Sequence, residues 1–138
     1  KIAVIGSGMT GLETAEFLSD EGNDIIVVEM AEELAPGTWI QHKMDVIPKL
    51  EDRGAKLLPG WKLIEMRTDS VEVEDVNLPG RKKNIPCDAI IMSLGVRPLG
   101  LDKDILAQAD LTFTVGDAEG AGRIAKATHE AYKAAMSL

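Results

Sequence analysis

The sequence is poor in cysteine and in aromatic residues. Its 138 residues include a single cysteine, Cys87, and aromatic residues make up 4% of the chain. One cysteine excludes an internal disulfide, and no C-x-x-C or C-x-x-x-x-C spacing of a redox dithiol or an iron–sulfur ligand set is present. This composition suits a reducing compartment, so we expect a cytoplasmic protein. Cys87 itself is expected to be a small buried residue.

Basic residues are also scarce relative to acidic ones. The 15 Lys and Arg residues against 23 Asp and Glu residues give a formal net charge of −8. This balance argues against nucleic acid or an anionic membrane surface as a partner. No apolar run approaches the ~20 residues of a membrane span, and no signal-peptide pattern is present. Any phosphate group must therefore be bound by backbone amides rather than by a basic patch.

Residue clusters typical of hydrolytic or metal chemistry are missing as well. No metal-ligand spacing and no Ser/His/Asp arrangement stands out. The two histidines, His42 and His129, fall on predicted helices, and we expect both to be structural or exposed. The sequence therefore predicts neither a metal site nor a catalytic residue within this chain.

A glycine-rich stretch follows the first apolar run. The β-branched run over 2–5 leads directly into Gly6, Gly8 and Gly11, which form a G-x-G-x-x-G pattern. Gly6 permits a sharp turn, Gly8 permits close approach of a pyrophosphate, and Gly11 lets the next helix lie close to the sheet. That helix would direct its free N–H groups and its positive dipole end at the phosphates. We therefore predict a cofactor site that includes Gly6, Gly8, Met9, Thr10 and Gly11.

An acidic residue closes the next predicted strand. We expect a helix over 9–21 and then a buried strand over 24–29 that ends in Glu29. Glu29 lies 29 − 11 = 18 positions after Gly11, close to the ~20 expected for a ribose-binding acid. We predict that its carboxylate binds both ribose hydroxyls, with Met30 beside it, and that it repels the 2′-phosphate of NADPH. The alternative is a solvated acid at a strand end.

Further strand and helix signals follow along the chain. The predicted elements are a helix from a capping box at Thr38 to Gly54 with a kink or break at Pro48, strands over 55–58, 62–67, 71–75 and 88–94, a solvated basic tip over 81–84, a strand over 112–115, and a helix over 122–136. The section between the third and last strands of the first domain is thus a β-meander. We predict an α/β, Rossmann-like three-layer domain: a central parallel sheet with helices on one face and an antiparallel β-meander crossover on the other.

Three stretches together resemble the two-dinucleotide-binding-domain flavoprotein reductases, the pyridine-nucleotide oxidoreductase superfamily. They are the glycine pattern with Glu29, the run over 88–98 that looks like an A-T-G-x-x-P segment, and the run over 112–117 that looks like a flavin-binding T-x-x-x-x-G-D. Within the superfamily, the stretch over 122–132 is most similar to the C-terminal region of old-yellow-enzyme-like NADH:flavin oxidoreductases. That group includes 2-enoate reductase, 2,4-dienoyl-CoA reductase and trimethylamine dehydrogenase.

In this superfamily the NAD domain is inserted into an FAD domain. The resemblance implies that residues 1–100 are an NAD(H)-binding domain. Residues 101–138 would then be the returning C-terminal segment of an otherwise missing FAD-binding domain. The chain opens on Lys1 within a strand, which also leads us to expect a fragment. Asp117 would hydrogen-bond FAD, and any FMN or iron–sulfur cluster would belong to domains outside this chain.

Two more residues are candidates for cofactor contacts. Gly95 ends the last predicted strand of the first domain and would allow close approach of the cofactor; a plain turn before Pro98 explains it equally well. Trp61 stands where the family often places an apolar residue against the adenine, and a core or surface tryptophan is the alternative.

The sequence thus predicts a nucleotide-binding fragment of a flavin-dependent oxidoreductase. In the intact enzyme it would position NADH, preferred over NADPH, for hydride transfer to FAD, and the isolated fragment would be inactive. Its partners would be the dinucleotide and the missing FAD and catalytic domains of the same chain. Two alternatives remain: a non-catalytic ADP-binding module, and a single-domain FAD-binding protein completed by Asp117.

Overall fold

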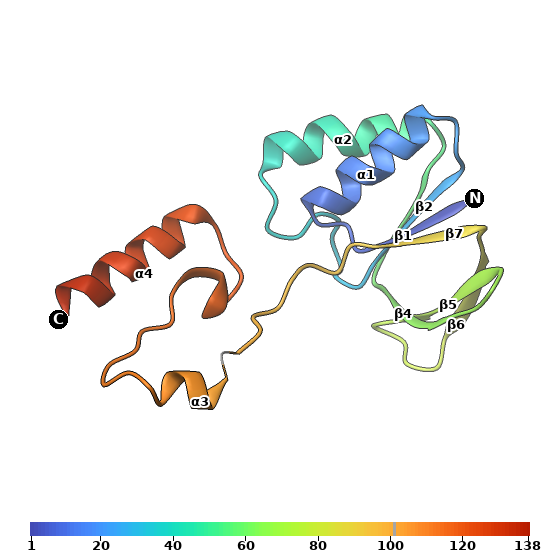
Figure 1. Ribbon diagram of the computed structural model, residues 1–138. Helices are drawn as coiled ribbons and strands as arrows, with labels where there is room; N and C mark the ends of the chain where they lie inside the picture. The colour runs from blue at the N-terminus through green and yellow to red at the C-terminus, as the bar shows by residue number, and fades with distance from the viewer. Residues whose placement is uncertain (101) are drawn as a thin grey trace. The chain divides into compact units, whose positions relative to one another are not determined.

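A four-stranded parallel sheet organises the first part of the chain (Figure 1). Its strands are β1 (Ile2–Ile5), β2 (Ile25–Glu29), β3 (Lys56–Pro59) and β7 (Ala89–Met92), in the order β3-β2-β1-β7. The structure is a computed structural model that describes residues 1–100 and 102–138. It divides into two compact units, Lys1–Gly95 and Val96–Leu138.

Two helices cover one face of this sheet (Figure 1). Helix α1 (Met9–Asp20) follows β1, and helix α2 (Ile40–Asp52) follows β2 and packs beside α1. Because successive strand side chains point to opposite faces, Val4 of β1 packs toward the helices while Ala3 and Ile5 point the other way. The side chains buried on the helix side are Val4, Leu12, Ala15, Ile25, Val27, Ala35, Val46 and Leu50.

The start of α2 differs from its prediction. The helix begins at Ile40, and its N-cap Trp39 makes no side-chain capping hydrogen bond. Thr38 lies in a turn instead, where its backbone N–H donates to the carbonyl oxygen of Ala35 at 3.1 Å. The N-cap is thus Trp39 rather than Thr38, and the predicted capping box does not form. The helix continues through Pro48 as a single element, without the break that was one predicted outcome.

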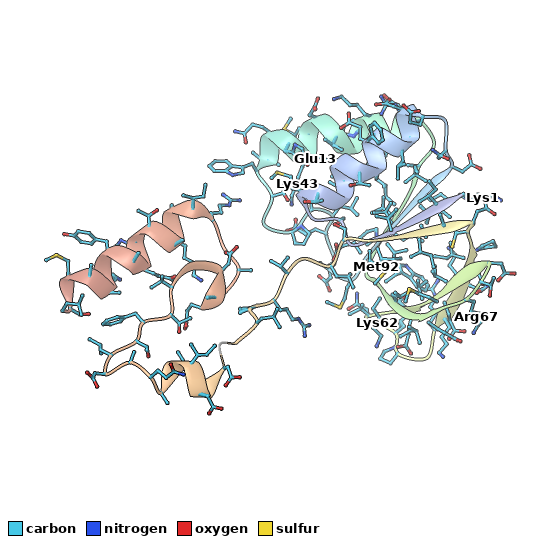
Figure 2. The ribbon with its side chains drawn as sticks, viewed as in Figure 1. Lys1, Glu13, Lys43, Lys62, Arg67 and Met92 are labelled. Atoms are coloured by element: carbon cyan, nitrogen blue, oxygen red, sulfur yellow. The ribbon has the colours of Figure 1, made fainter. Side chains whose placement is uncertain are left out.

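An antiparallel meander packs on the opposite face of the parallel sheet. It consists of β4 (Trp61–Met66), β5 (Ser70–Asp75) and β6 (Lys82–Pro86), in the order β4-β5-β6. Figure 2 shows Lys62 and Arg67 on this meander and Glu13 on the helices. The side chains buried between the two sheets are Ala3, Ile5, Ile26, Val28, Val71, Val73, Ile85 and Cys87. Cys87 is buried as predicted, and the predicted α/β three-layer fold is confirmed.

Residues 81–84 are exposed, as expected for the predicted solvated basic tip, but most of this run is a strand. Residues Lys82 to Asn84 belong to β6 and pair with β5, and Lys82 forms an ion pair with Glu72 at 2.8 Å. Their side chains are exposed, so the run carries no apolar alternation that would reveal a strand. The backbone hydrogen bonds to β5 order it instead.

The second unit contains helices and irregular backbone. Its elements are a short helix α3 (Lys103–Leu106), a 3-10 turn η1 (Gly116–Ala118) and helix α4 (Ile124–Met136). The predicted strand over 112–115 is wrong: in the described part of the chain these residues pair with no strand. A strand needs a neighbour for its ladder, and no other strand lies in residues 96–100 or 102–138. His129 on α4 is exposed as predicted, and residue 101, the start of the predicted second domain, lies outside the described residues.

No helix among the described residues combines the length and apolar character needed to cross a membrane.

Candidate nucleotide-binding site

The loop from β1 to α1 places three glycines in different surroundings. Gly6 has a φ of +99°, and a Cβ there would overlap the carbonyl oxygen of Ser93, which follows β7. A Cβ on Gly11 would overlap the carbonyl oxygen of Gly6. By contrast, nothing lies within 4 Å of the position that a Cβ on Gly8 would occupy. Packing therefore requires Gly6 and Gly11, whereas Gly8 leaves open space beside the loop.

Gly8 is also the N-cap of α1. The first N–H groups of any α-helix have no partner within the helix, and Gly8 has no side chain to cap them. The side chains of Met9 and Thr10 in the first turn are exposed, and that turn contains no acidic residue. These N–H groups and the positive end of the helix dipole are therefore available to an anion.

Glu29 ends β2 next to this loop, and its carboxylate is held by three hydrogen bonds. Its Oε2 accepts from the backbone N–H of Ser7 at 2.7 Å and from the Ser7 hydroxyl at 2.8 Å. Its Oε1 accepts from the backbone N–H of Ala31 at 2.8 Å. A carboxylate offers about four acceptor positions. Of the two oxygens, Oε1 therefore accepts fewer of these hydrogen bonds than Oε2.

The pKa of the Glu29 carboxyl lies below its ordinary value. Burial raises this pKa, since the residue is 8% exposed. The hydrogen bonds donated by Ala31, Ser7 and Met30 favour the charged form and together outweigh burial. Glu29 is therefore a buried carboxylate at neutral pH, held beside the glycine loop.

This lowered pKa makes stability depend on pH. A carboxyl with a lower pKa in the folded state stabilises the fold above its unfolded pKa of about 4.3. That contribution is lost as the pH falls through the lower folded value. We expect Glu29→Gln to lose less unfolding free energy than the wild type between about pH 5 and pH 3, because an amide does not titrate. Urea unfolding at several pH values measures this difference.

The control is Glu21→Gln, which removes one exposed carboxylate at the end of α1. If the unfolding free energy of Glu29→Gln falls with decreasing pH as steeply as that of the wild type, Glu29 does not contribute to the pH dependence.

The structure brings some of the other predicted residues to the same edge of the sheet. Met30 is exposed directly after Glu29. The N–H of Gly60 donates to the carbonyl oxygen of Ala31 at 2.8 Å, so the turn into β4 touches the loop after Glu29. Trp61 follows that turn and packs against the core between the sheets.

The Trp61 ring also lies close to two cations. The Arg81 guanidinium is 5.5 Å from the ring centroid, and the Lys83 ammonium is 5.7 Å from it. Both distances are within the range of cation–π attraction.

Two predicted residues lie farther along the chain. Gly95 is exposed, has a φ of +76° and follows Ser93, the residue that contacts the glycine loop. Asp117 belongs to the second unit, where its carboxylate accepts from the N–H of Gly122 at 3.1 Å. Beside it, Gly116 is buried against Ala127 of α4.

Sequence reasoning assigned no role to Ser7. Its side chain is 0% exposed, and its hydroxyl contacts Glu29 and the backbone N–H of Ala35. The one available signal was a polar residue between two glycines of the motif, which by itself does not identify a partner.

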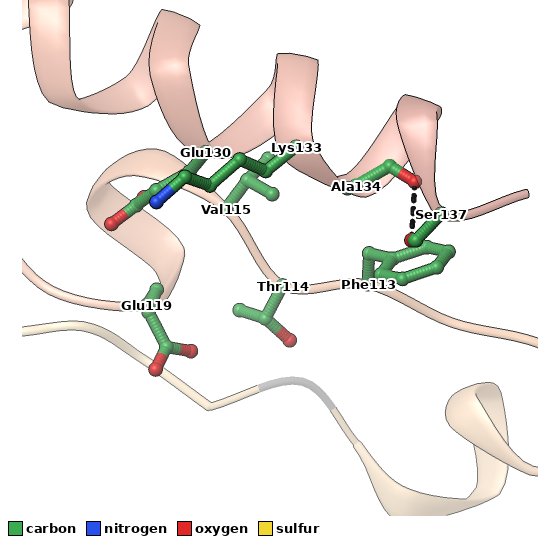
Figure 3. Close-up of a pocket in the computed structure, with 8 residues that line it drawn as sticks. All are labelled: Phe113, Thr114, Val115, Glu119, Glu130, Lys133, Ala134 and Ser137. Carbon is green, nitrogen blue, oxygen red and sulfur yellow. Dashed lines mark hydrogen bonds between the residues drawn. The ribbon is translucent and has the colours of Figure 1, made fainter.

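A pocket in the second unit contains none of the predicted residues. Figure 3 shows it between α4 and the backbone that precedes η1. The hydroxyl of Ser137 at one end donates to the carbonyl oxygen of Ala134 at 2.7 Å. The lining residues are Phe113, Thr114, Val115, Glu119, Glu130, Lys133, Ala134 and Ser137. The pocket is open and carries charges of both signs, so its chemistry does not favour one ligand class.

Comparisons with known proteins match this chain to oxidoreductases. The family model described as pyridine nucleotide-disulphide oxidoreductase matches residues 1–121. A bilirubin reductase of Mediterraneibacter gnavus is 36% identical over 140 residues, which cover 100% of this chain and 21% of that protein. An NADH oxidase of Methanocaldococcus jannaschii is 36% identical over 99 residues, covering 71% of this chain and 21% of that protein.

A solved structure supports the fold. The 6-hydroxypseudooxynicotine amine oxidase from Pseudomonas geniculata N1 matches with a TM-score of 0.77 and 24% identity, over 98% of this chain and 21% of that one. The chain therefore spans about a fifth of the length of these proteins.

Proposed function

The chain belongs to the pyridine nucleotide-disulphide oxidoreductase family, and on this basis we propose that its first unit positions NADH for hydride transfer to FAD in an intact enzyme. One observation carries the proposal: the open space at Gly8 and the buried Glu29 carboxylate adjoin the same glycine loop. Dinucleotides bind at this edge of a parallel sheet, outside the carboxyl ends of the strands.

The proposed pyrophosphate site uses backbone groups. Gly8 leaves room for the phosphates, and the first N–H groups of α1, at Met9 and Thr10, donate to them. The helix dipole adds a favourable field for the negative charge. This arrangement binds phosphate in a chain whose net charge is −8.

The proposed ribose site centres on Glu29. Its Oε1, which accepts fewer of the hydrogen bonds from Ser7 and Ala31 than Oε2 does, receives a ribose hydroxyl beside those bonds. A 2′-phosphate would place like charges together, and the next residues include Glu32 and Glu33 but no arginine. We therefore propose a preference for NADH over NADPH. The name of the NADH oxidase relative is consistent with this choice.

The remaining candidate residues would contact other parts of the dinucleotide or the FAD domain. Trp61 would lie against the adenine, since its turn touches the loop after Glu29. Gly95 would border the nicotinamide half. Residues 101–138 would return to an FAD domain, with Asp117 near the flavin cofactor. The bilirubin reductase match extends over the whole chain and so includes residues 101–138.

The same match is compatible with the old-yellow-enzyme-like group that the sequence resembles. FMN and an iron–sulfur cluster would belong to domains outside this chain, in a cytoplasmic enzyme.

Nucleotide titration of the 138-residue chain tests the proposal. We expect NADH to bind at least about tenfold more tightly than NADPH, a difference of about 1.4 kcal/mol. Glu29→Ala should reduce this preference, because it removes both the hydroxyl acceptor and the repelling charge. Calorimetry with NADH, NADPH, ADP and FAD measures each affinity.

Each alternative has its own result in this titration. Binding of NADPH alone would overturn the role of Glu29. ADP binding as tight as NADH binding, in an intact protein that does not oxidise NADH, would favour a non-catalytic module. A yellow chain that retains FAD would favour a single-domain flavoprotein.

A further inference from the structure

The hydroxyl of Ser7 connects two segments that the sequence separates. It donates to Glu29 Oε2 at 2.8 Å and accepts from the backbone N–H of Ala35 at 2.8 Å. The side chain is 0% exposed, so both bonds are shielded from bulk solvent. One hydroxyl group therefore joins the glycine loop, the end of β2 and the loop that follows β2.

The backbone at Ala35 is in a conformation that alanine rarely adopts. Its φ is +51°, and it is the one non-glycine residue with positive φ in the part of the chain that the structure describes. The residue is fully buried against the helix-side core. Its N–H bonds to Ser7 and its carbonyl oxygen to the N–H of Thr38, so both of its peptide groups are held. A strained residue held on both sides marks a loop position that the surroundings specify.

These contacts fix both ends of the loop over 31–35. The N–H of Ala31 bonds to Glu29 Oε1, and the N–H of Ala35 bonds to the Ser7 hydroxyl. Glu29 Oε1 is therefore bordered by a loop that the Ser7 hydroxyl holds at its other end. Ser7→Ala removes the hydroxyl donor to Glu29 while the Ser7 backbone N–H can still donate. It also leaves the buried N–H of Ala35 without its partner.

We propose that Ser7 is a specificity-determining positioning residue: its hydroxyl holds Glu29 and the loop over 31–35 in the arrangement that accepts a free ribose 2′-hydroxyl and rejects a 2′-phosphate. This inference depends on the proposed function, in which Glu29 receives the adenine ribose of NADH. Ser7 acts through Glu29 and through the loop.

The experiment uses two ligands that differ only at the ribose 2′ position. Calorimetry compares 5′-AMP with adenosine 2′,5′-bisphosphate on the full chain, for the wild type and for Ser7→Ala. We expect the wild type to prefer 5′-AMP. In Ser7→Ala we expect 5′-AMP to bind about three- to tenfold more weakly, as for one lost hydrogen bond, with a smaller change for the bisphosphate. The ratio of the two affinities should therefore fall.

A matched control is Ser70→Ala. Ser70 is also buried, at 4% exposed, and its hydroxyl donates to Asp69 at 3.0 Å at the start of β5. Its replacement removes a part-buried hydrogen bond from a serine hydroxyl to a carboxylate without touching the glycine loop. The affinity ratio of Ser70→Ala should equal that of the wild type.

A second readout separates positioning from a general structural role. The Ser7 hydroxyl helps to lower the pKa of Glu29. As the solution is acidified, Ser7→Ala should therefore begin to lose 5′-AMP binding at a higher pH than the wild type does. If the variant were only less stable, the pH at which 5′-AMP binding is half lost would be the same as in the wild type.

The outcomes are distinct. A wild-type chain that binds neither nucleotide, or binds both equally, overturns the proposed function. A wild type that prefers 5′-AMP together with a folded Ser7→Ala that keeps the same ratio overturns the role of Ser7. If Ser7→Ala does not fold, the ratio of Ser7→Cys, whose thiol is a weaker donor, decides instead. The affinity ratio of Ser7→Cys falls if Ser7 positions Glu29. It stays at the wild-type value if Ser7 has no such role.

Discussion

Gly8→Ala is expected to fold normally and to lose most of its affinity for NADH. Gly8 has a φ of −56° and a ψ of 172°, which an alanine adopts without strain, and nothing lies within 4 Å of the added Cβ. In the proposed binding mode, that Cβ would occupy the space through which the pyrophosphate would approach the N–H groups of α1. Loss of two charge-assisted hydrogen bonds corresponds to at least about a 100-fold increase in Kd. Calorimetry measures the affinity.

Stability should change little in this variant. Alanine is a poorer N-cap than glycine, so we expect a loss of at most about 1 kcal/mol in the free energy of unfolding. Gly100→Ala is a matched control, because a Cβ there also meets nothing within 4 Å and it lies in the second unit. It should bind NADH like the wild type. Unchanged NADH binding by a folded Gly8→Ala would show that the pyrophosphate does not lie at this loop.

Gly11→Ala should destabilise the protein, although the same change stabilises most helices. Alanine is favoured over glycine inside a helix by about 1 kcal/mol. At Gly11 the added Cβ overlaps the carbonyl oxygen of Gly6 and lies 3.1 Å from Ser93 Oγ. The main-chain oxygen cannot move unless the turn from β1 to α1 shifts. We therefore expect a net loss of about 2–3 kcal/mol, as for overpacking of a tight core, measured by urea unfolding.

Ala15→Gly provides the comparison in the same helix. Ala15 is fully buried on α1, and its replacement should cost about 1 kcal/mol from helix propensity together with the loss of a buried methyl group. The two variants thus exchange the same two residue types in opposite directions, and both should lower stability. A Gly11→Ala protein as stable as the wild type would contradict the close packing of α1 on the glycine turn.

Local signals predicted the first thirty residues well. The β-branched run became β1, the glycine turn led into α1 at Met9, and Glu29 ends β2. Each of these elements follows from patterns within a few residues: apolar runs, glycine positions and helical periodicity. The predicted fold class is confirmed for the same reason, since alternating strands and helices favour a parallel sheet covered by helices.

Two failures occurred where structure depends on a distant partner. Lys82 and its neighbours form β6 because β5 offers a ladder, although their own side chains are polar. The run over 112–115 has strand propensity but meets no neighbouring strand in the described chain, so it stays irregular. Strand formation is decided by pairing, which local propensity does not report.

The candidate site also combines features that local sequence determines with features that only the tertiary structure determines. The sequence by itself determined the three glycines, the position of Glu29 after them and the excess of negative charge, because these are properties of local order and composition. Only the tertiary structure decided that Ser7 bonds to both Glu29 and Ala35, and that Ser93 contacts Gly6. The strand order β2-β1-β7 brings these residues, far apart in the chain, to one edge of the sheet. Hydrogen bonds and close contacts between them exist only once that pairing has formed.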